Sequence, residues 1–352
     1  EKLLKTIISL TWLVACLSPT VVFALLPLGH KTFGLIQLSA SRNMSYWTSF
    51  YALGVDSKFQ ISPPGMVFID RRIIGETETG FNLPVGDYAV RTNIAASYLY
   101  QRIQEKTAPV NPIIRRASEI GCGFDIAFPL QQDVEITLGF FNRFLLLDKK
   151  RSYARELSSS LEADRADILA PRLSAIKHTG NYNGGFYYVR GTHKTQSFRS
   201  VEMQQTITSD KNIAIPTQYG LVAAFPLSVS SVALDLSAVR ASEGSPATQA
   251  GVSVLDDYLD FLAVTRTPLG RSMLLGADFS YRTASYSSSA FTNLDTMPLG
   301  GIDLYLDFGS NVDYWRIGVL MRRGQDRASI TEFNSKYQFV GVGFVLGLAS
   351  EM

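Results

Sequence analysis

The sequence predicts an all-β fold, an antiparallel up-and-down β-barrel that spans a membrane through its strands. The first observation is a period of two in the apolar residues, clearest in the segment GCGFDIAFPLQQDVEITLGFFNRFLLL at residues 121–147. Strand side chains alternate between faces, so this hairpin has one bulky apolar face and one small, polar or charged face. The second observation is that the pattern recurs along the chain. The third is that short turns alternate with long polar loops, which is typical of transmembrane barrels.

The hairpin at residues 121–147 shows how the two faces are built. One parity of its two strands is apolar and contains Cys122, Phe124, Ile126 and Phe128, then Val134, Ile136, Leu138 and Phe140. The other parity contains Gly123, Asp125 and Ala127, then Glu135, Thr137, Gly139 and Arg143. A slip of one residue would turn the charged set toward hydrocarbon, so the strand register is strongly specified.

The composition excludes several classes of function. The net charge of the 352 residues is +2, and no basic stripe is interleaved with aromatic residues, so we expect no nucleic-acid partner. The two cysteines are Cys16, in an N-terminal apolar stretch, and Cys122. We therefore predict no disulfide in a processed chain, no metal site and no cofactor.

The N-terminus resembles a secretory signal. Lys2 and Lys5 precede the apolar run TIISLTWLVACL, and small residues follow up to Ala24. We predict a signal peptide at residues 1–24 and a single barrel domain at residues 25–352, which begins with a short periplasmic stub. Two alternatives stay open: a lipoprotein box that would make Cys16 the lipidated first residue, and a signal anchor spanning residues 6–29.

The order of turns and loops gives the strand count. The first pair of strands is expected at residues 33–44 and in a segment ending near Asn82. The short turns are expected at residues 83–87, 129–133, 226–230, 267–271 and 308–313, and the long loops at residues 103–118, 148–182, 241–256, 285–299 and 324–336. The piece RSYARELSSSLEADRADILA at residues 151–170 has helical spacing and is expected to be a surface helix. We predict 14 strands, with 12 as the alternative; FYYV and SFRSVEM, in residues 184–208, would supply the last two.

Charge placement predicts which face meets lipid. The apolar parity carries no charge in the clearest strands, whereas the opposite parity carries thirteen ionisable residues that we predict to line the lumen. These are Arg91, Asp125, Glu135, Arg143, Asp235, Asp260, Arg266, Asp278, Arg282, Asp303, Asp307, Arg316 and Arg322. A basic side chain near the bilayer midplane costs about 2 to 4 kcal/mol on the lipid face of a barrel, which supports this assignment.

The last strand, KYQFVGVGFVLGL, places Val340, Val342, Phe344, Leu346 and Leu348 on the lipid face. It resembles the C-terminal strand that the barrel-assembly machinery recognises, although it ends in Leu-Ala-Ser-Glu-Met and not in an aromatic residue. The assembly machinery and the lipid of the outer membrane are therefore the expected partners.

Taken together, the signal, the strands and the turn asymmetry resemble a Gram-negative outer-membrane β-barrel of the porin and transporter class. The resemblance implies passive passage of small solutes through a mixed-charge lumen. The alternative is a closed barrel that has a structural role or binds a partner through its long loops. We predict no enzymatic activity; the weak rival is a hydrolase centred on His193, with Ser197 and Asp210 nearby in sequence.

Overall fold

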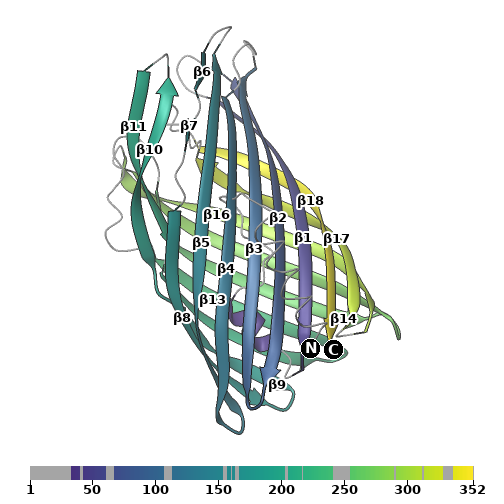
Figure 1. The fold of residues 1–352 in the computed structure, drawn as a ribbon. Coiled ribbons are helices and arrows are strands. Elements are labelled where there is room, and N and C mark those ends of the chain that lie inside the picture. Colours follow the sequence, from purple (N-terminus) through teal and green to yellow (C-terminus); the bar gives the residue numbers. More distant parts are fainter. Residues whose placement is uncertain are drawn as a thin grey trace, which may run out of the picture.

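The computed structural model describes residues 33–39, 43–60, 67–106, 113–153, 157–159, 161–162, 166–202, 205–215, 217–240, 254–288, 291–310, 313–327 and 336–351. In this part of the chain a closed antiparallel barrel surrounds one short helix, α2 (Figure 1). The predicted signal peptide, the beginning of the stub and Cys16 lie outside the described residues.

Fourteen strands form the barrel wall, which confirms the predicted fold class and strand count. They are β1 (Ser45–Gln60), β2 (Val67–Val85), β3 (Tyr88–Glu105), β4 (Ile113–Gln131), β5 (Val134–Tyr153), β8 (Ala166–Thr179), β9 (Tyr182–Val189), β12 (Thr217–Leu227), β13 (Ser230–Arg240), β14 (Val254–Pro268), β15 (Met273–Ser288), β16 (Phe291–Gly309), β17 (Tyr314–Arg327) and β18 (Lys336–Glu351). Each pairs with its neighbours in chain order, and β1 pairs with β18 to close the ring.

The short turns lie where the sequence predicts them. Strands β2 and β3, for example, are separated only by Gly86 and Asp87. Gly86 has φ of 63°, a left-handed conformation that glycine adopts without a steric penalty. A further short turn that the sequence analysis missed joins β8 to β9, and Gly180 has φ of 56° there.

Two predicted elements are wrong because residue spacing alone does not separate strands from helices. The first predicted strand, at residues 33–44, is instead the helix α2 (Phe33–Ser39), and the first strand begins at Ser45. The predicted surface helix at residues 151–170 is instead the end of β5, the short strands β6 (Leu157–Ser159) and β7 (Leu161–Glu162), and the start of β8. The apolar run FGLIQLS fits either state, and packing inside the barrel selects the helix.

Several predicted loops are shorter than expected. The predicted loop at residues 285–299 is largely strand, because β15 continues to Ser288 and β16 begins at Phe291. The predicted loop at residues 148–182 contains all of β8. Residues 285–288 and 291–296 are mostly polar, and β8 has apolar residues on both parities, so neither region shows the alternation that predicts a strand.

Of the two segments expected to complete the 14 strands, FYYV and SFRSVEM, only FYYV is part of the barrel wall. FYYV lies in β9, as expected, but residues 197–202 of SFRSVEM lie in β10 (Thr192–Glu202), which leaves the wall and forms a separate sheet with β7 and β11 (Gln205–Ile215). The pairs Val189↔Gln218 and Thr192↔Ile215 continue one register, so β10 and β11 extend the hairpin of β9 and β12 beyond the barrel. Strand β8 takes the place in the wall that was expected for SFRSVEM.

The outer surface of the wall is apolar. Side chains of the predicted lipid-facing parity are the exposed ones, and they include Leu221, Phe261, Phe279, Leu304, Ile317, Val319, Val342 and Phe344. The residues between them are mostly buried, as the period of two requires. Among the described residues no helix has the length and apolar character needed to cross a membrane.

Candidate lumenal site

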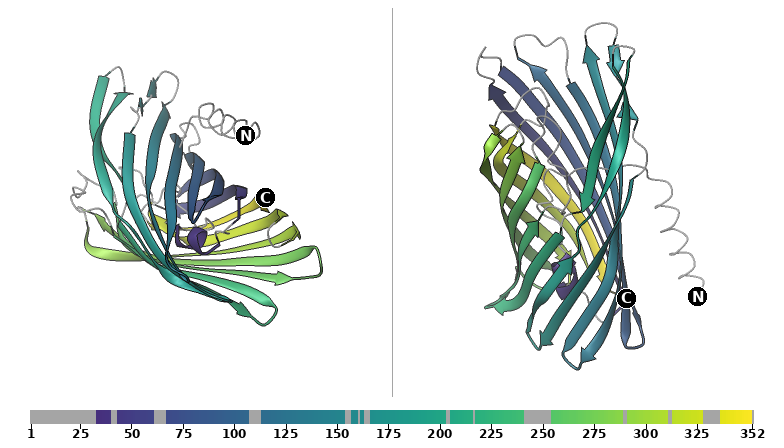
Figure 2. Two further views of the ribbon diagram at one scale, coloured as in Figure 1. Left: turned by 60° about the horizontal axis from the view of Figure 1, so that its bottom comes forward. Right: turned by 90° about the vertical axis from the view of Figure 1, so that its left-hand side faces the viewer.

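Helix α2 lies inside the barrel and packs against its wall (Figures 1 and 2). Phe33, Leu35 and Leu38 form a buried apolar cluster with inward-facing residues of β8, β9, β12 and β14, namely Ala170, Ile176, Tyr187, Val189, Val222 and Leu262. The ring of Phe33 meets that of Tyr187 edge to face, with centroids 5.9 Å apart. One side of the helix is therefore held by burial of apolar surface.

Gln37 connects α2 to a different part of the wall. Its Oε1 atom accepts hydrogen bonds from the Thr137 hydroxyl at 3.0 Å and from the Arg91 guanidinium. The same guanidinium donates to both carboxylate oxygens of Glu135, at 2.8 and 3.1 Å. Helix α2 is thus attached to β3 and β5 by polar contacts, and it packs against β8, β9, β12 and β13, so it connects strands from β3 to β13 across the lumen.

Arg172 of β8 makes a second link between wall and helix. It donates to Asp125 Oδ1 at 2.6 Å from its Nε atom and to Asn93 at 3.2 Å. Its guanidinium carbon also lies 4.5 Å from the centroid of the Phe33 ring, within the range of a cation–π contact. The side chains of Arg172 and Asp125 are almost fully buried, so the ion pair is shielded from water.

Asp307 is the centre of a cluster on the side of the barrel formed by β14 to β17. Arg316 donates to its two oxygens at 2.7 and 2.9 Å, and Arg266 donates to it from Nε at 3.1 Å. Arg316 lies 3.7 Å from the ring centroid of Tyr305, whose hydroxyl donates to Asp278 at 2.8 Å. The two cations are thus held by one fully buried carboxylate and by aromatic rings.

The structure brings the predicted lumenal residues together in pairs. Beyond the contacts above, Arg282 pairs with Asp260, Arg322 with Asp303, and the Tyr187 hydroxyl donates to Asp235. All the predicted residues with a described side chain therefore have a partner; nothing is described of the Arg143 side chain. Arg172 is not among the predicted lumenal residues, because it falls in a predicted loop. The buried pair of Asp70 and Arg72, which share a parity in β2, was not predicted either.

Part of the inner wall is apolar, which the charge pattern did not indicate. Leu53 and Val55 of β1, Ile74 of β2, and Leu320 of β17 are buried on the inward parity of neighbouring strands. Strand β18 lies between β1 and β17, and its inward positions here are Gly341 and Gly343, which have no side chain. Leu53, Val55, Ile74 and Leu320 together form the inner apolar patch.

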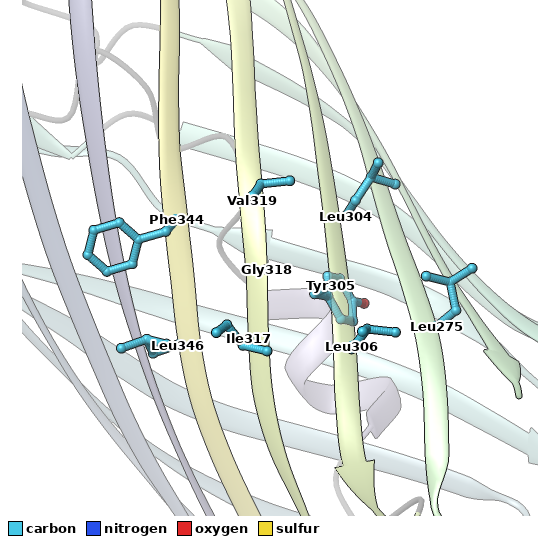
Figure 3. A pocket seen from close by; sticks show the side chains of 9 residues that line it. All are labelled: Leu275, Leu304, Tyr305, Leu306, Ile317, Gly318, Val319, Phe344 and Leu346. Atoms are coloured by element: carbon cyan, nitrogen blue, oxygen red, sulfur yellow. The ribbon is translucent and has the colours of Figure 1, made fainter. Parts of the chain in front are cut away.

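A hollow of about 570 Å³ lies on the outer surface and not in the lumen (Figure 3). Its walls are side chains of the lipid-facing parity, among them Leu304, Ile317, Val319 and Phe344, while Tyr305 and Gly318 contribute to its floor. Such a lining suits contact with acyl chains, so the hollow is part of the lipid-facing surface.

His193, Ser197 and Asp210 all lie in the hairpin of β10 and β11. Ser197 and Asp210 are register partners, and His193 is four residues from Ser197 along β10, which is about 13 Å at the rise of a β-strand. Within the described ranges, no group of three or more His, Cys, Asp and Glu residues could hold a metal ion.

Each described wall strand pairs with a neighbour on both sides, and the outer belt is apolar. These two features make the chain a transmembrane β-barrel, the architecture of Gram-negative outer-membrane proteins. No family model matches the chain, and no curated protein matches it.

Solved structures do resemble it. The Pseudomonas putida toluene transporter TodX superposes with a TM-score of 0.59 at 10% identity, over 90% of this chain and 92% of TodX. The Ralstonia pickettii toluene transporter TbuX gives 0.57 at 10% identity, over 92% and 94% of the two chains. A Pseudomonas aeruginosa FadL homologue gives 0.56 at 9% identity, over 87% and 89%. At these identities the likeness establishes a shared fold.

Proposed function

We propose that the protein is an outer-membrane channel for passive diffusion of small hydrophobic solutes. The observation that carries the proposal is the inner apolar patch of Leu53, Val55, Ile74 and Leu320. A water-filled pore needs a polar lining, whereas an apolar inner surface lowers the free energy of a hydrocarbon relative to water. TodX and TbuX, which share this fold, are toluene transporters, and this likeness supports the same class of solute.

The paired charges fit this function better than they fit ion selection. Arg322 with Asp303 and Arg172 with Asp125 are buried ion pairs whose fields largely cancel. Neither sign of ion gains a continuous path of favourable charge from such pairs. We interpret the mixed-charge part of the lumen as a rigid inner wall that surrounds a solute path, and α2 as the element that narrows this path.

Hydrocarbon uptake by intact cells tests the proposal. Vesicles of phospholipid are unsuitable, because hydrocarbons dissolve in them without a protein. We expect cells that produce the wild-type barrel to take up toluene faster than cells without it. A polar group left without a hydrogen bond in an apolar path costs about 1 to 3 kcal/mol, so Leu320→Gln should slow uptake by about tenfold.

Leu269→Gln is the matched control, because Leu269 is 50% exposed in the turn between β14 and β15. It should leave uptake unchanged. Equal uptake by cells with and without the wild-type protein, at equal amounts of folded barrel, would reject the channel and favour the alternative of a closed barrel that binds a partner through its loops.

A further inference from the structure

Two arginines face each other on the outside of the barrel. The register pairs Arg71 of β2 directly with Arg102 of β3, and both side chains are exposed on the lipid-facing parity. Lys106, also exposed, follows Arg102 at the end of β3. In Figure 1 strands β2 and β3 lie side by side through the whole height of the wall. These three residues are named the outer basic cluster.

The outer basic cluster lies where the apolar belt ends. On the same face of β3, Tyr98 and Tyr100 precede Arg102, and on β2 the exposed Ile73 lies on the membrane side of Arg71. Aromatic girdles mark the boundary between hydrocarbon and headgroups. The cluster is at the end of the strands opposite the short β2–β3 turn, which is the extracellular end of such barrels. It therefore lies at the height of the headgroups of the outer leaflet.

The protein neutralises this charge only weakly. Like charges directly opposite each other on neighbouring strands are unfavourable. Asp56 of β1 is the register partner of Arg71 on its other side, but its Oδ2 atom is 3.7 Å from the Arg71 Nε atom and both side chains are more than 60% exposed. Among the described side chains, no ion pair involves Arg102 or Lys106. The cluster thus carries three cations against one loosely placed carboxylate.

A phosphate group matches this arrangement. Paired guanidinium groups can each donate two hydrogen bonds to phosphate oxygens, and a phosphate between them replaces repulsion by attraction. The geometry points to a binding site for the phosphate groups of a phosphorylated glycolipid in the outer leaflet, formed by Arg71, Arg102 and Lys106. The site is on the outer surface, so it does not depend on which solute passes through the lumen.

Binding of fluorescent lipopolysaccharide to the purified full-length barrel in detergent tests this site. Replacing both arginines, in Arg71→Gln with Arg102→Gln, should weaken binding by about tenfold or more, because two sets of charge-assisted hydrogen bonds are lost. Arg71→Lys with Arg102→Lys keeps the charge without the planar donor pair and should bind with intermediate affinity. Arg271→Gln is the matched control, since Arg271 is exposed in the turn at the opposite end of the barrel and should not affect binding.

Two further ligands identify the source of the phosphate. Dephosphorylated lipopolysaccharide should bind wild type as weakly as the intact lipid binds the double glutamine variant. Inorganic phosphate at millimolar concentration should not displace the lipid, because the acyl chains contribute contacts with the apolar belt. The inference fails if the double variant binds like wild type, if the dephosphorylated lipid binds equally well, or if free phosphate competes efficiently. Toluene uptake is measured in a separate assay, so a negative result for lipid binding can be distinguished from a negative result for the channel.

Discussion

The Oε1 atom of Gln37 in the lumenal helix accepts a hydrogen bond from the hydroxyl of Thr137 in β5, at 3.0 Å. Arg91 donates to the same oxygen and is itself held by Glu135. One amide oxygen thus joins α2 to two strands of the wall. The apolar face of the helix packs against other strands, so two different kinds of interaction keep α2 within the lumen.

We expect Gln37→Ala to loosen α2 without unfolding the barrel. Loss of an acceptor shared by a cation and a hydroxyl removes about 1.5 to 3 kcal/mol of helix docking, and amide hydrogen exchange at residues 33–39 should quicken by about tenfold or more. Hydrogen exchange read out by mass spectrometry measures this, with Gln132→Ala in the exposed β4–β5 turn as the control. Unchanged exchange in α2 would mean that the apolar contacts alone hold it.

Arg172 and Asp125 form a buried pair whose members depend on each other. Asp125→Ala should destabilise the barrel by about 3 to 5 kcal/mol, because it leaves the Arg172 cation buried without its partner. The double variant Asp125→Ala with Arg172→Met should lose less stability than the sum of the two single variants. Urea unfolding in detergent, followed by tryptophan fluorescence, gives the four free energies of this cycle. Additive losses would show that the pair contributes no coupling.

Tyr305 of β16 lies across Gly276 of β15 on the inner wall. A Cβ atom at residue 276 would be 1.8 Å from Cε2 of the tyrosine ring, so Gly276→Ala must displace the ring and weaken its hydrogen bond to Asp278. Overpacking of this kind costs about 1 to 3 kcal/mol. Gly75→Ala is the control, because nothing lies within 4 Å of its added Cβ atom. The urea midpoint should fall for residue 276 only; equal midpoints for both variants would contradict the close packing.

Asp313, in the turn before β17, secures the end of β18. Hydrogen bonds from the Ser350 hydroxyl at 2.6 Å and the Glu351 amide at 2.9 Å lower the pKa of this carboxyl below its usual value of 3.8. Since the folded pKa is the lower one, the stabilisation is fully present above pH 3.8 and is lost as the pH falls through the folded value.

Hydrogen exchange at Ser350 and Glu351 should therefore quicken as the medium is acidified below pH 4, once corrected for the intrinsic pH dependence of exchange. Asp313→Asn should remove this pH dependence. The same acid response in Asp313→Asn and in wild type would assign it to another group.

The sequence by itself determined the barrel class and the identity of the two faces, and it favoured the observed count of 14 strands while it assigned one of them to the wrong segment. A period of two is a local property of the sequence, because Leu304 and Asp303 lie on opposite faces of β16 whatever strands pair with it. The apolar side chain of Leu304 is the one that can face lipid. The same pattern placed Asp307 and Arg316 on one face. Most of the short turns could be predicted because turn length and turn-forming residue types are also local properties of the sequence.

Only the tertiary structure decided the remainder. Helix α2 is stable because the barrel surrounds it, and a seven-residue apolar run does not reveal that in isolation. Arg172 becomes the partner of Asp125 because β8 and not β10 enters the wall, and neither segment has an alternation clear enough to predict this. Which residue meets which partner depends on strand order and on the positions of side chains far apart in the chain, and alternation within a single strand contains neither.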